Sequence, residues 1–158
     1  MKMEVLTVKQ KETIKIQKPM DTIPLLKEFY NLNKISKFQE IFSVITLDAN
    51  NNVISVSFVT MGTLNNSIVH PREIFAKAIS DHARAIIISH NHPSGNPNPS
   101  EEDIATTKSL ILASYIIGIE LLDHIIITPT QYFSFLEHQL IEEFENSKDL
   151  KNLLKAVK

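Results

Sequence analysis

The sequence predicts an α/β domain in which helices flank a mixed β-sheet. The chain has 158 residues, 43% of them hydrophobic, which is enough to bury the core of one globular domain. Short apolar runs rich in β-branched residues alternate along the chain with segments of helical spacing. The run AIIIS at residues 85–89 is apolar almost throughout, as is typical of a central strand covered on both faces.

The first elements of this alternation lie near the N-terminus. Residues 3–16 have the pattern of an extended segment, and Pro19 and Asp21 then open an amphipathic helix that runs to about Tyr30. The first convincing strand, EIFSVITLD, begins at Glu40.

A hairpin follows, because the residues after this strand favour a turn. Asp48–Asn52 is rich in asparagine, and NVISVSFVT then alternates as a returning strand. A further short strand is predicted near residues 64–69.

The second half of the chain continues the alternation. Pro71 suits the first turn of a helix that runs to about Ala83. A second helical pattern runs from Ser100 to Gly118, a glycine that fits a C-terminal cap. IELLDHIIIT predicts another buried strand, and YFSFLEHQLIEEF with the Lys-rich end predicts one or two closing helices.

Composition narrows the classes of protein. The absence of cysteine excludes disulfides and thiolate metal sites, and the net charge of -2 does not indicate a nucleic-acid binder. No apolar run reaches the length of about 20 residues that spans a bilayer. The N-terminus MKMEVLTVKQKETIKIQ mixes charged and apolar residues where a signal peptide would be continuously apolar. We therefore predict a cytoplasmic protein without a membrane segment.

Two histidines lie where the AIIIS strand ends, in the stretch SHNHPSGNPNPSEED. Side chains alternate in an extended segment, so His90 and His92 point to the same side. A proline-rich loop then turns the chain into a helix that begins at Ser100, which brings Asp103 back toward the histidines. Two neutral imidazoles and one carboxylate are an ordinary ligand set for a catalytic zinc, with a fourth position left for water.

Simpler interpretations of the same residues exist. Ser100 and Asp103 also have the spacing of a helix start, where the serine caps and the acid favours the positive end of the helix dipole. Capping and metal binding are compatible. An HxH pair alone is a weak signal, but here it joins a strand end, a proline stop, and a serine eight and an aspartate eleven residues after His92.

This combination resembles the JAB/MPN metalloenzymes, whose motif is HxH, seven residues, then SxxD. The segment HNHPSGNPNPSEED matches that spacing without a gap. With HPRE before it and GIELLDHIIIT after it, the segment is similar to the RadC branch, whose members are usually labelled DNA repair proteins. The resemblance covers about Phe38 to Glu137. It implies Zn²⁺ as the cofactor and a cytidine-deaminase-like architecture.

The resemblance also suggests how the chain is divided. We expect residues 37–158 to form a RadC-like JAB/MPN domain with C-terminal helices, and residues 1–36 to form an N-terminal arm and helix packed on it. Many RadC-like proteins carry a helix-hairpin-helix region at the N-terminus. This chain lacks the room and the glycine-containing hairpin for one, which weighs against direct DNA binding.

A glutamate far upstream that acts on the metal-bound water is a further implication of the resemblance. Glu40 is the candidate, fifty residues before His90; otherwise it is a surface acid at a strand start. Glu73 is the rival, although the helix dipole alone explains an acid in that first helical turn. In the implied mechanism zinc lowers the pKa of its water, Glu40 moves the proton to the leaving amine, and Ser100 stabilises the oxyanion.

Three classes of function follow. The favoured one is a zinc metallopeptidase or isopeptidase, with a peptide or isopeptide substrate. The second is a DNA-associated factor of repair or of a mobile element, including a nuclease, since the same residues could attack a phosphodiester or deaminate a base. The third is a non-catalytic interaction module.

The remaining histidines have structural interpretations. His124 is either a core residue or a residue behind the site that orients a ligand, and Asp123 beside it is open. The others fit surface or helix-end positions: His70, His82 and His138.

Overall fold

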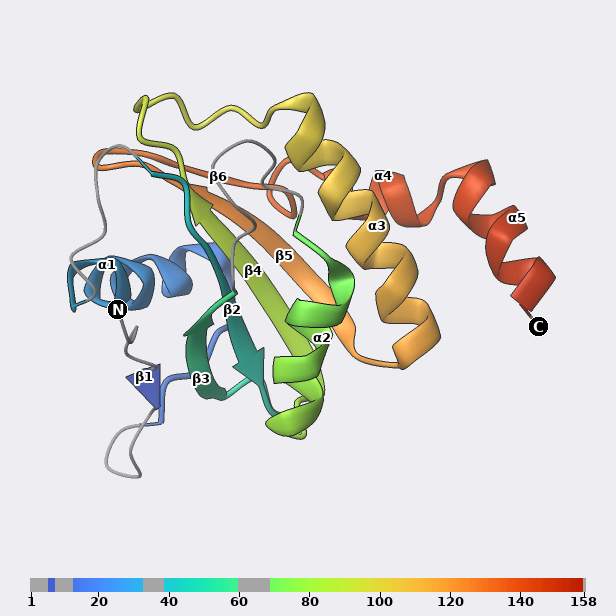
Figure 1. Cartoon of the computed structure of the whole chain (residues 1–158), viewed down its shortest axis with the longest axis horizontal. Helices are drawn as coiled ribbons and strands as arrows, with labels where there is room; N and C mark the ends of the chain where they lie inside the picture. Colours follow the sequence, from blue (N-terminus) through green and yellow to red (C-terminus); the bar gives the residue numbers. More distant parts are fainter. Residues whose placement is uncertain (1–5, 8–12, 33–38, 60–68, 158) are drawn as a thin grey trace.

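A computed structural model describes residues 6–7, 13–32, 39–59 and 69–157 (Figure 1). These residues form a six-stranded mixed sheet in the order β1-β3-β2-β4-β5-β6. Its strands are β1 (Leu6–Thr7), β2 (Phe42–Leu47), β3 (Val53–Phe58), β4 (Ala85–Asn91), β5 (Glu120–Ile127) and β6 (Tyr132–Ser134). The helices are a 3₁₀ turn (Pro19–Asp21), α1 (Thr22–Leu32), α2 (Pro71–Ser80), α3 (Glu101–Ile117), α4 (Leu140–Glu145) and α5 (Lys148–Val157). The predicted α/β class is confirmed.

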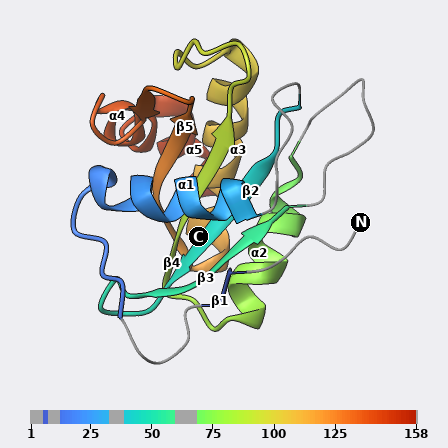
Figure 2. The ribbon, with the colours of Figure 1, turned by 90° about the vertical axis from the view of Figure 1, so that its left-hand side faces the viewer.

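Strand β4 lies inside the sheet, antiparallel to β2 and parallel to β5. Its side chains alternate between two cores because a strand has a period of two. Ile86 and Ile88 join the core with α2 and α3, whereas Ala85 and Ile87 join the core with α1. The two views agree that α1 covers one face of the sheet and α2 and α3 the other (Figures 1 and 2). Burial on both faces explains why AIIIS is apolar throughout.

The predicted hairpin is formed by β2 and β3, which pair antiparallel. Asp48 closes its turn by accepting the backbone N–H groups of Asn50 and Asn52 on one carboxylate oxygen, and Asn51 adopts a left-handed φ of 62°. The strand was predicted to start at Glu40, and β2 begins two residues later, at Phe42. The strand predicted near residues 64–69 lies, apart from Val69, outside the described residues, as does most of the predicted extended segment 3–16.

Both helices predicted around the histidine motif are present. Pro71 opens α2, which ends at Ser80, a little before the predicted Ala83. Ser100 caps the start of α3, and Gly118 caps its end with a φ of 80° that favours glycine.

One prediction at the C-terminal end is wrong. Tyr132–Ser134 forms strand β6, antiparallel to β5, where we predicted the start of a helix. Aromatic side chains suit a strand, and Thr128 closes the tight turn by bonding to Gln131 through both backbone and side chain. Helix formation therefore starts only at Leu140. None of the helices among the described residues has both the length and the apolarity to cross a bilayer.

Candidate metal centre

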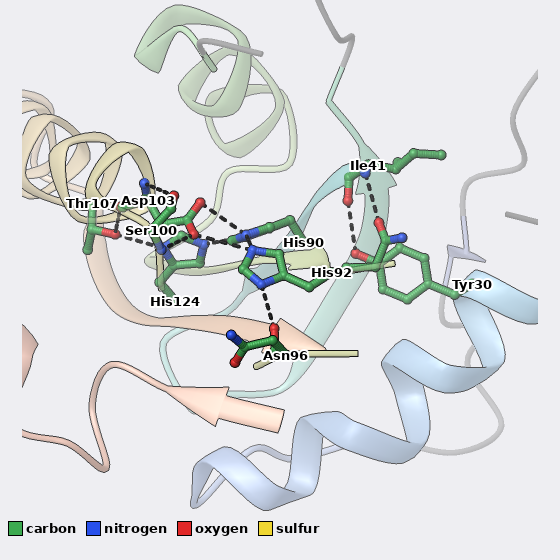
Figure 3. Close-up of polar contacts among 10 residues, drawn as sticks. Tyr30, Ile41, His90, His92, Asn96, Ser100, Asp103, Thr107 and His124 are labelled. Atoms are coloured by element: carbon green, nitrogen blue, oxygen red, sulfur yellow. Dashed lines mark hydrogen bonds and ion pairs between the residues drawn. The ribbon is translucent and has the colours of Figure 1, made fainter. Parts of the chain in front are cut away.

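His90, His92 and Asp103 converge between the end of β4 and the first turn of α3 (Figure 3). The Nε2 atoms of the two histidines lie 2.9 Å apart. The Asp103 carboxylate lies 3.1 Å from His90 Nε2 through one oxygen and 3.3 Å from His92 Nε2 through the other. All three residues are buried, with exposed fractions of 0%, 9% and 6% respectively. They can hold a metal ion, because their ligand atoms all lie within 4.8 Å of one another.

The backbone continues past β4 in the way that brings the two histidines together. His92 N–H donates to the Ile127 carbonyl at 3.0 Å, which extends the pairing with β5 by one residue. The chain then turns: Gly95, with a φ of 81°, donates its N–H to the His92 carbonyl at 3.1 Å. The His92 ring is fixed in turn, because its Nδ1 lies 2.8 Å from the Asn96 carbonyl oxygen.

Asp103 also takes part in the helix cap. Ser100 Oγ accepts the Asp103 N–H at 3.1 Å, and the Ser100 N–H donates to the Asp103 carboxylate at 2.8 Å. Burial alone would raise the pKa of Asp103, but the hydrogen bond and charge of His90 and the Ser100 N–H outweigh it and hold this pKa well below 3.8. The carboxylate is therefore ionised. The two predicted roles of Asp103 share one geometry.

His124 lies directly behind His90. Its Nε2 is 2.8 Å from His90 Nδ1, and its ring stacks on Phe135 at 4.7 Å between centroids. Phe42 stacks on His90 at 4.5 Å, so aromatic rings enclose both imidazoles. Burial, followed by the charge of His90, lowers the pKa of His124 well below 6.5. Two interpretations were left open for His124. The contact of its Nε2 with His90 Nδ1 favours the one in which His124 orients a ligand.

Asp123 points to a different set of partners. Its carboxylate accepts the Ser134 hydroxyl at 2.6 Å and the backbone N–H groups of Leu136 and His124. Burial raises the pKa of Asp123 to about 6. The residue anchors the chain after β6 to β5.

Glu40 lies at the same end of the sheet, just before β2, and its side chain is exposed. The Asn91 side chain anchors the backbone on both sides of it, accepting the Ile41 N–H at 2.8 Å and donating to the Gln39 carbonyl at 2.9 Å. Tyr30 OH adds a 3.2 Å bond to the Ile41 carbonyl (Figure 3). Burial raises the pKa of Tyr30 to about 12, so this hydroxyl keeps its proton and remains a donor.

The strand register places Glu40 on the face of the sheet that carries His90. Phe42 pairs directly with His90 across β2 and β4, and residues two apart in an extended chain share a face. Glu40 forms no hydrogen bond or ion pair with His90, His92 or Asp103 within the described part of the chain. Its role as general base stays a prediction.

The other candidates are placed as follows. Glu73 lies half-buried in the first turn of α2, as predicted. Ser100 is exposed, and its hydroxyl oxygen accepts the Asp103 N–H. The remaining histidines are exposed: His70, His82 and His138.

Sequence reasoning missed Asn91 and Thr107. Asn91 carries a signal, because the middle residue of HxH must face away from the histidines, and a polar side chain there needs partners of its own. Thr107 carries none, since it reads as one more position on a helix face. Its hydroxyl lies 2.7 Å from His124 Nδ1.

The sequence matches a known protein family and several curated proteins. The family described as RadC-like JAB domain matches residues 16–140. UPF0758 proteins of Alkaliphilus oremlandii and Methanospirillum hungatei are each 52% identical, over 80% and 77% of this chain and 53% of their own lengths. A UPF0758 protein of Clostridium acetobutylicum is 48% identical over 82% of this chain and 55% of its own.

The chain thus spans about half the length of these curated relatives. The family match covers both the histidine strand and the helix that supplies Asp103. This family together with the buried His-His-Asp cluster is consistent with a metal-dependent hydrolase. The chain belongs to the RadC-like JAB domain family.

Proposed function

We propose that this chain is a zinc-dependent hydrolase that cleaves an amide or isopeptide bond. The observation that carries the proposal is the buried cluster of His90, His92 and Asp103, whose ligand atoms face one another at the end of an interior strand. Buried polar groups of this kind are costly unless each has a partner or a shared cation.

The cluster fits a zinc ion. Ligand atoms at zinc distances of 2.0–2.1 Å in a tetrahedron lie about 3.3 Å apart. The two Nε2 atoms lie 2.9 Å apart, His90 Nε2 lies 3.1 Å from one Asp103 oxygen, and His92 Nε2 lies 3.3 Å from the other oxygen. Each of these separations is within a few tenths of an ångström of that value. His92 is also in the right tautomer: the Asn96 carbonyl can only accept, so Nδ1 carries the proton and Nε2 keeps its lone pair. Imidazole and carboxylate ligands with no thiolate are typical of catalytic zinc.

Zinc in this position would polarise a water and lower its pKa to about 7. Glu40 would take the proton from the attacking water and deliver it to the leaving amine, as a general base and then a general acid. Anchoring of the peptide groups on both sides of Glu40 by Asn91 supports this role, because general-base catalysis requires a carboxylate held at a set distance.

Ser100 would assist from the start of α3. Its hydroxyl oxygen accepts the Asp103 N–H, and the helix cap holds the residue one turn before Asp103. A hydroxyl in that position can donate to the oxygen on which negative charge develops, and the bond strengthens as the charge builds.

The test is elemental analysis of the purified chain after exposure to zinc and removal of excess metal. We expect one zinc per chain, and less than a tenth of that in a His90→Ala, His92→Ala double variant whose circular dichroism shows a retained fold. Stoichiometric zinc in the double variant would contradict the site.

Hydrolysis is then measured on a fluorogenic isopeptide-linked peptide, a linear peptide, and single- and double-stranded DNA. Cleavage of the isopeptide or peptide probe that stops in the double variant supports the proposal. Zinc-dependent cleavage of DNA alone would instead support the DNA-associated alternative. The relatives extend well beyond the part that this chain matches, so any partners of the whole protein should be present in this assay as well.

A further inference from the structure

Two buried side chains behind the metal cluster, Thr107 and His124, form a continuous series of hydrogen bonds with the ligand His90. Thr107 Oγ1 lies 2.6 Å from the Asp103 carbonyl oxygen and 2.7 Å from His124 Nδ1. His124 Nε2 then lies 2.8 Å from His90 Nδ1. Thr107, His124 and His90 each have an exposed fraction of 0%. Figure 3 shows this series of hydrogen bonds, which runs from α3 through His124 to the end of β4.

The protons in this series of hydrogen bonds can be placed by counting donors and acceptors. The Asp103 carbonyl has no proton to give, so the single hydroxyl proton of Thr107 must lie in the 2.6 Å contact. Thr107 Oγ1 can then only accept from His124, which puts the proton of the neutral His124 ring on Nδ1. His124 Nε2 is therefore unprotonated, and it accepts the proton on His90 Nδ1.

Hydrogen bonds that run in the opposite direction are excluded by the contact between Thr107 and Asp103. If His124 donated from Nε2 to His90, its Nδ1 would need the Thr107 hydroxyl proton. The Thr107 and Asp103 oxygens would then face each other at 2.6 Å with no proton between them, an arrangement that repels.

We propose that Thr107 and His124 are positioning residues of the metal site: Thr107 sets the tautomer of His124, and His124 holds His90 with its Nε2 directed toward His92 and Asp103, where this atom can bind a metal. The inference rests on the metal site of the proposed function, although it does not require that the chain hydrolyse anything. Partners of this kind orient ligating histidines, and their removal typically costs 10- to 100-fold in metal affinity.

The arrangement does more than fill the core. Thr107 and Asp103 are one turn apart on α3, so the same hydroxyl that fixes His124 bonds to the backbone of a second ligand. The chain of bonds therefore joins two metal ligands that lie on different elements, β4 and α3. Packing alone would require only that the His124 ring stack on Phe135, which a phenylalanine would also do.

The test compares zinc affinity, measured by competition with a chromophoric chelator, in four chains. Thr107→Val keeps the shape and removes the hydroxyl, and we expect it to lower the affinity on the order of 10- to 100-fold. Thr107→Ser restores the hydroxyl, so its zinc affinity is expected to stay close to that of the unmodified chain. The matched control is Ser114→Ala, which removes another buried hydroxyl of α3 whose only bond within the described residues is to the helix carbonyl of Ile111. It should leave the affinity unchanged.

A double-mutant cycle then asks whether Thr107 acts through His124. His124→Phe removes the acceptor for His90 while keeping a ring beside Phe135. In that background, Thr107→Val should have little further effect on zinc affinity, since the two changes remove the same chain of bonds. Fully additive effects would overturn the proposal.

The second readout needs no metal and no activity. Two-bond ¹H–¹⁵N correlation spectra of the metal-free chain distinguish the two neutral tautomers of a histidine, and we expect His124 as the Nδ1–H form. An Nε2–H form, or zinc affinity of Thr107→Val equal to that of the unmodified chain, would overturn the proposal. If the unmodified chain binds no zinc, the proposed function fails, and the His124 tautomer still decides the direction of the bonds. If Thr107→Val does not fold, the His124 tautomer of the unmodified chain decides the outcome instead.

Discussion

Asn91 Oδ1 accepts a hydrogen bond from the backbone N–H of Ile41 at 2.8 Å, across fifty residues of sequence. Its amide also donates to the Gln39 carbonyl at 2.9 Å. A side-chain amide that accepts on one side and donates on the other imitates a neighbouring strand. It therefore continues the β2–β4 pairing beyond its last ladder pair, Phe42 with His90. Glu40 is the residue between the two anchored peptide groups.

Loss of this anchor should weaken hydrolysis without removing the metal. Asn91→Ala removes both bonds, so we expect the rate on the isopeptide-linked peptide to fall on the order of 10- to 100-fold, because small displacements of a catalytic group are costly. The fall should appear mainly in kcat, and zinc content should stay at one per chain. Asn91→Asp keeps the acceptor for Ile41 and loses the donor to Gln39, so its rate should lie between the two. An Asn91→Ala chain as fast as the unmodified one would show that the anchor does not position the base.

The general base is tested by Glu40→Gln, which keeps the size of the side chain and removes its ability to take a proton. We expect zinc binding to stay nearly intact and hydrolysis to fall about 100-fold or more, within the range of general-base catalysis. The matched control is Glu73→Gln, in the first turn of α2, which should change neither quantity. If Glu73→Gln is the slow variant and Glu40→Gln is not, the assignment of the base is wrong.

The two roles of Ser100 can be separated by comparing stability with rate. Ser100→Ala removes the acceptor of the Asp103 N–H, and loss of such a cap typically costs about 1 kcal/mol in the free energy of unfolding. Ser100→Asn restores a capping oxygen but not the hydroxyl, so urea denaturation should show its stability recovered. If the hydroxyl stabilises the oxyanion, hydrolysis stays slow in both variants. Full recovery of the rate in Ser100→Asn would leave Ser100 with the cap alone.

Stability should depend on pH through Asp123. Burial raises its folded pKa to about 6 from the usual 3.8, so the folded chain binds this proton more tightly than the unfolded chain does. The contribution favours folding below about pH 4 and is lost as pH rises toward about 6. Relative to Asp123→Asn, we expect the free energy of unfolding to fall over that window by on the order of 3 kcal/mol.

Denaturation curves of both chains, measured without metal from pH 4 to 7, check this prediction. The titration of the three metal ligands cancels in the difference between the two chains. Parallel profiles of stability against pH would show that Asp123 keeps an ordinary pKa in the folded chain.

The sequence was sufficient for features set by neighbours along the chain. The two-residue period of a strand places His90 and His92 on one face, and the capping signals at Ser100 and Gly118 bound α3, so the three metal ligands could be named together. The predicted central strand follows from the same local rules, because an all-apolar run must be covered on both faces.

The features that the sequence did not reveal depend on register and packing. Tyr132–Ser134 becomes a strand because the free edge of β5 lies beside it, which no local helical pattern can signal. Asn91 meets Gln39 and Ile41 only through the β2–β4 register, and Thr107 meets His124 only once α3 has packed on β5. The sequence by itself therefore determined which residues can bind a metal, since strand and helix periods are local. Only the tertiary structure decided which side chains orient those ligands, because contacts across 17 to 52 residues arise from the packing of whole elements.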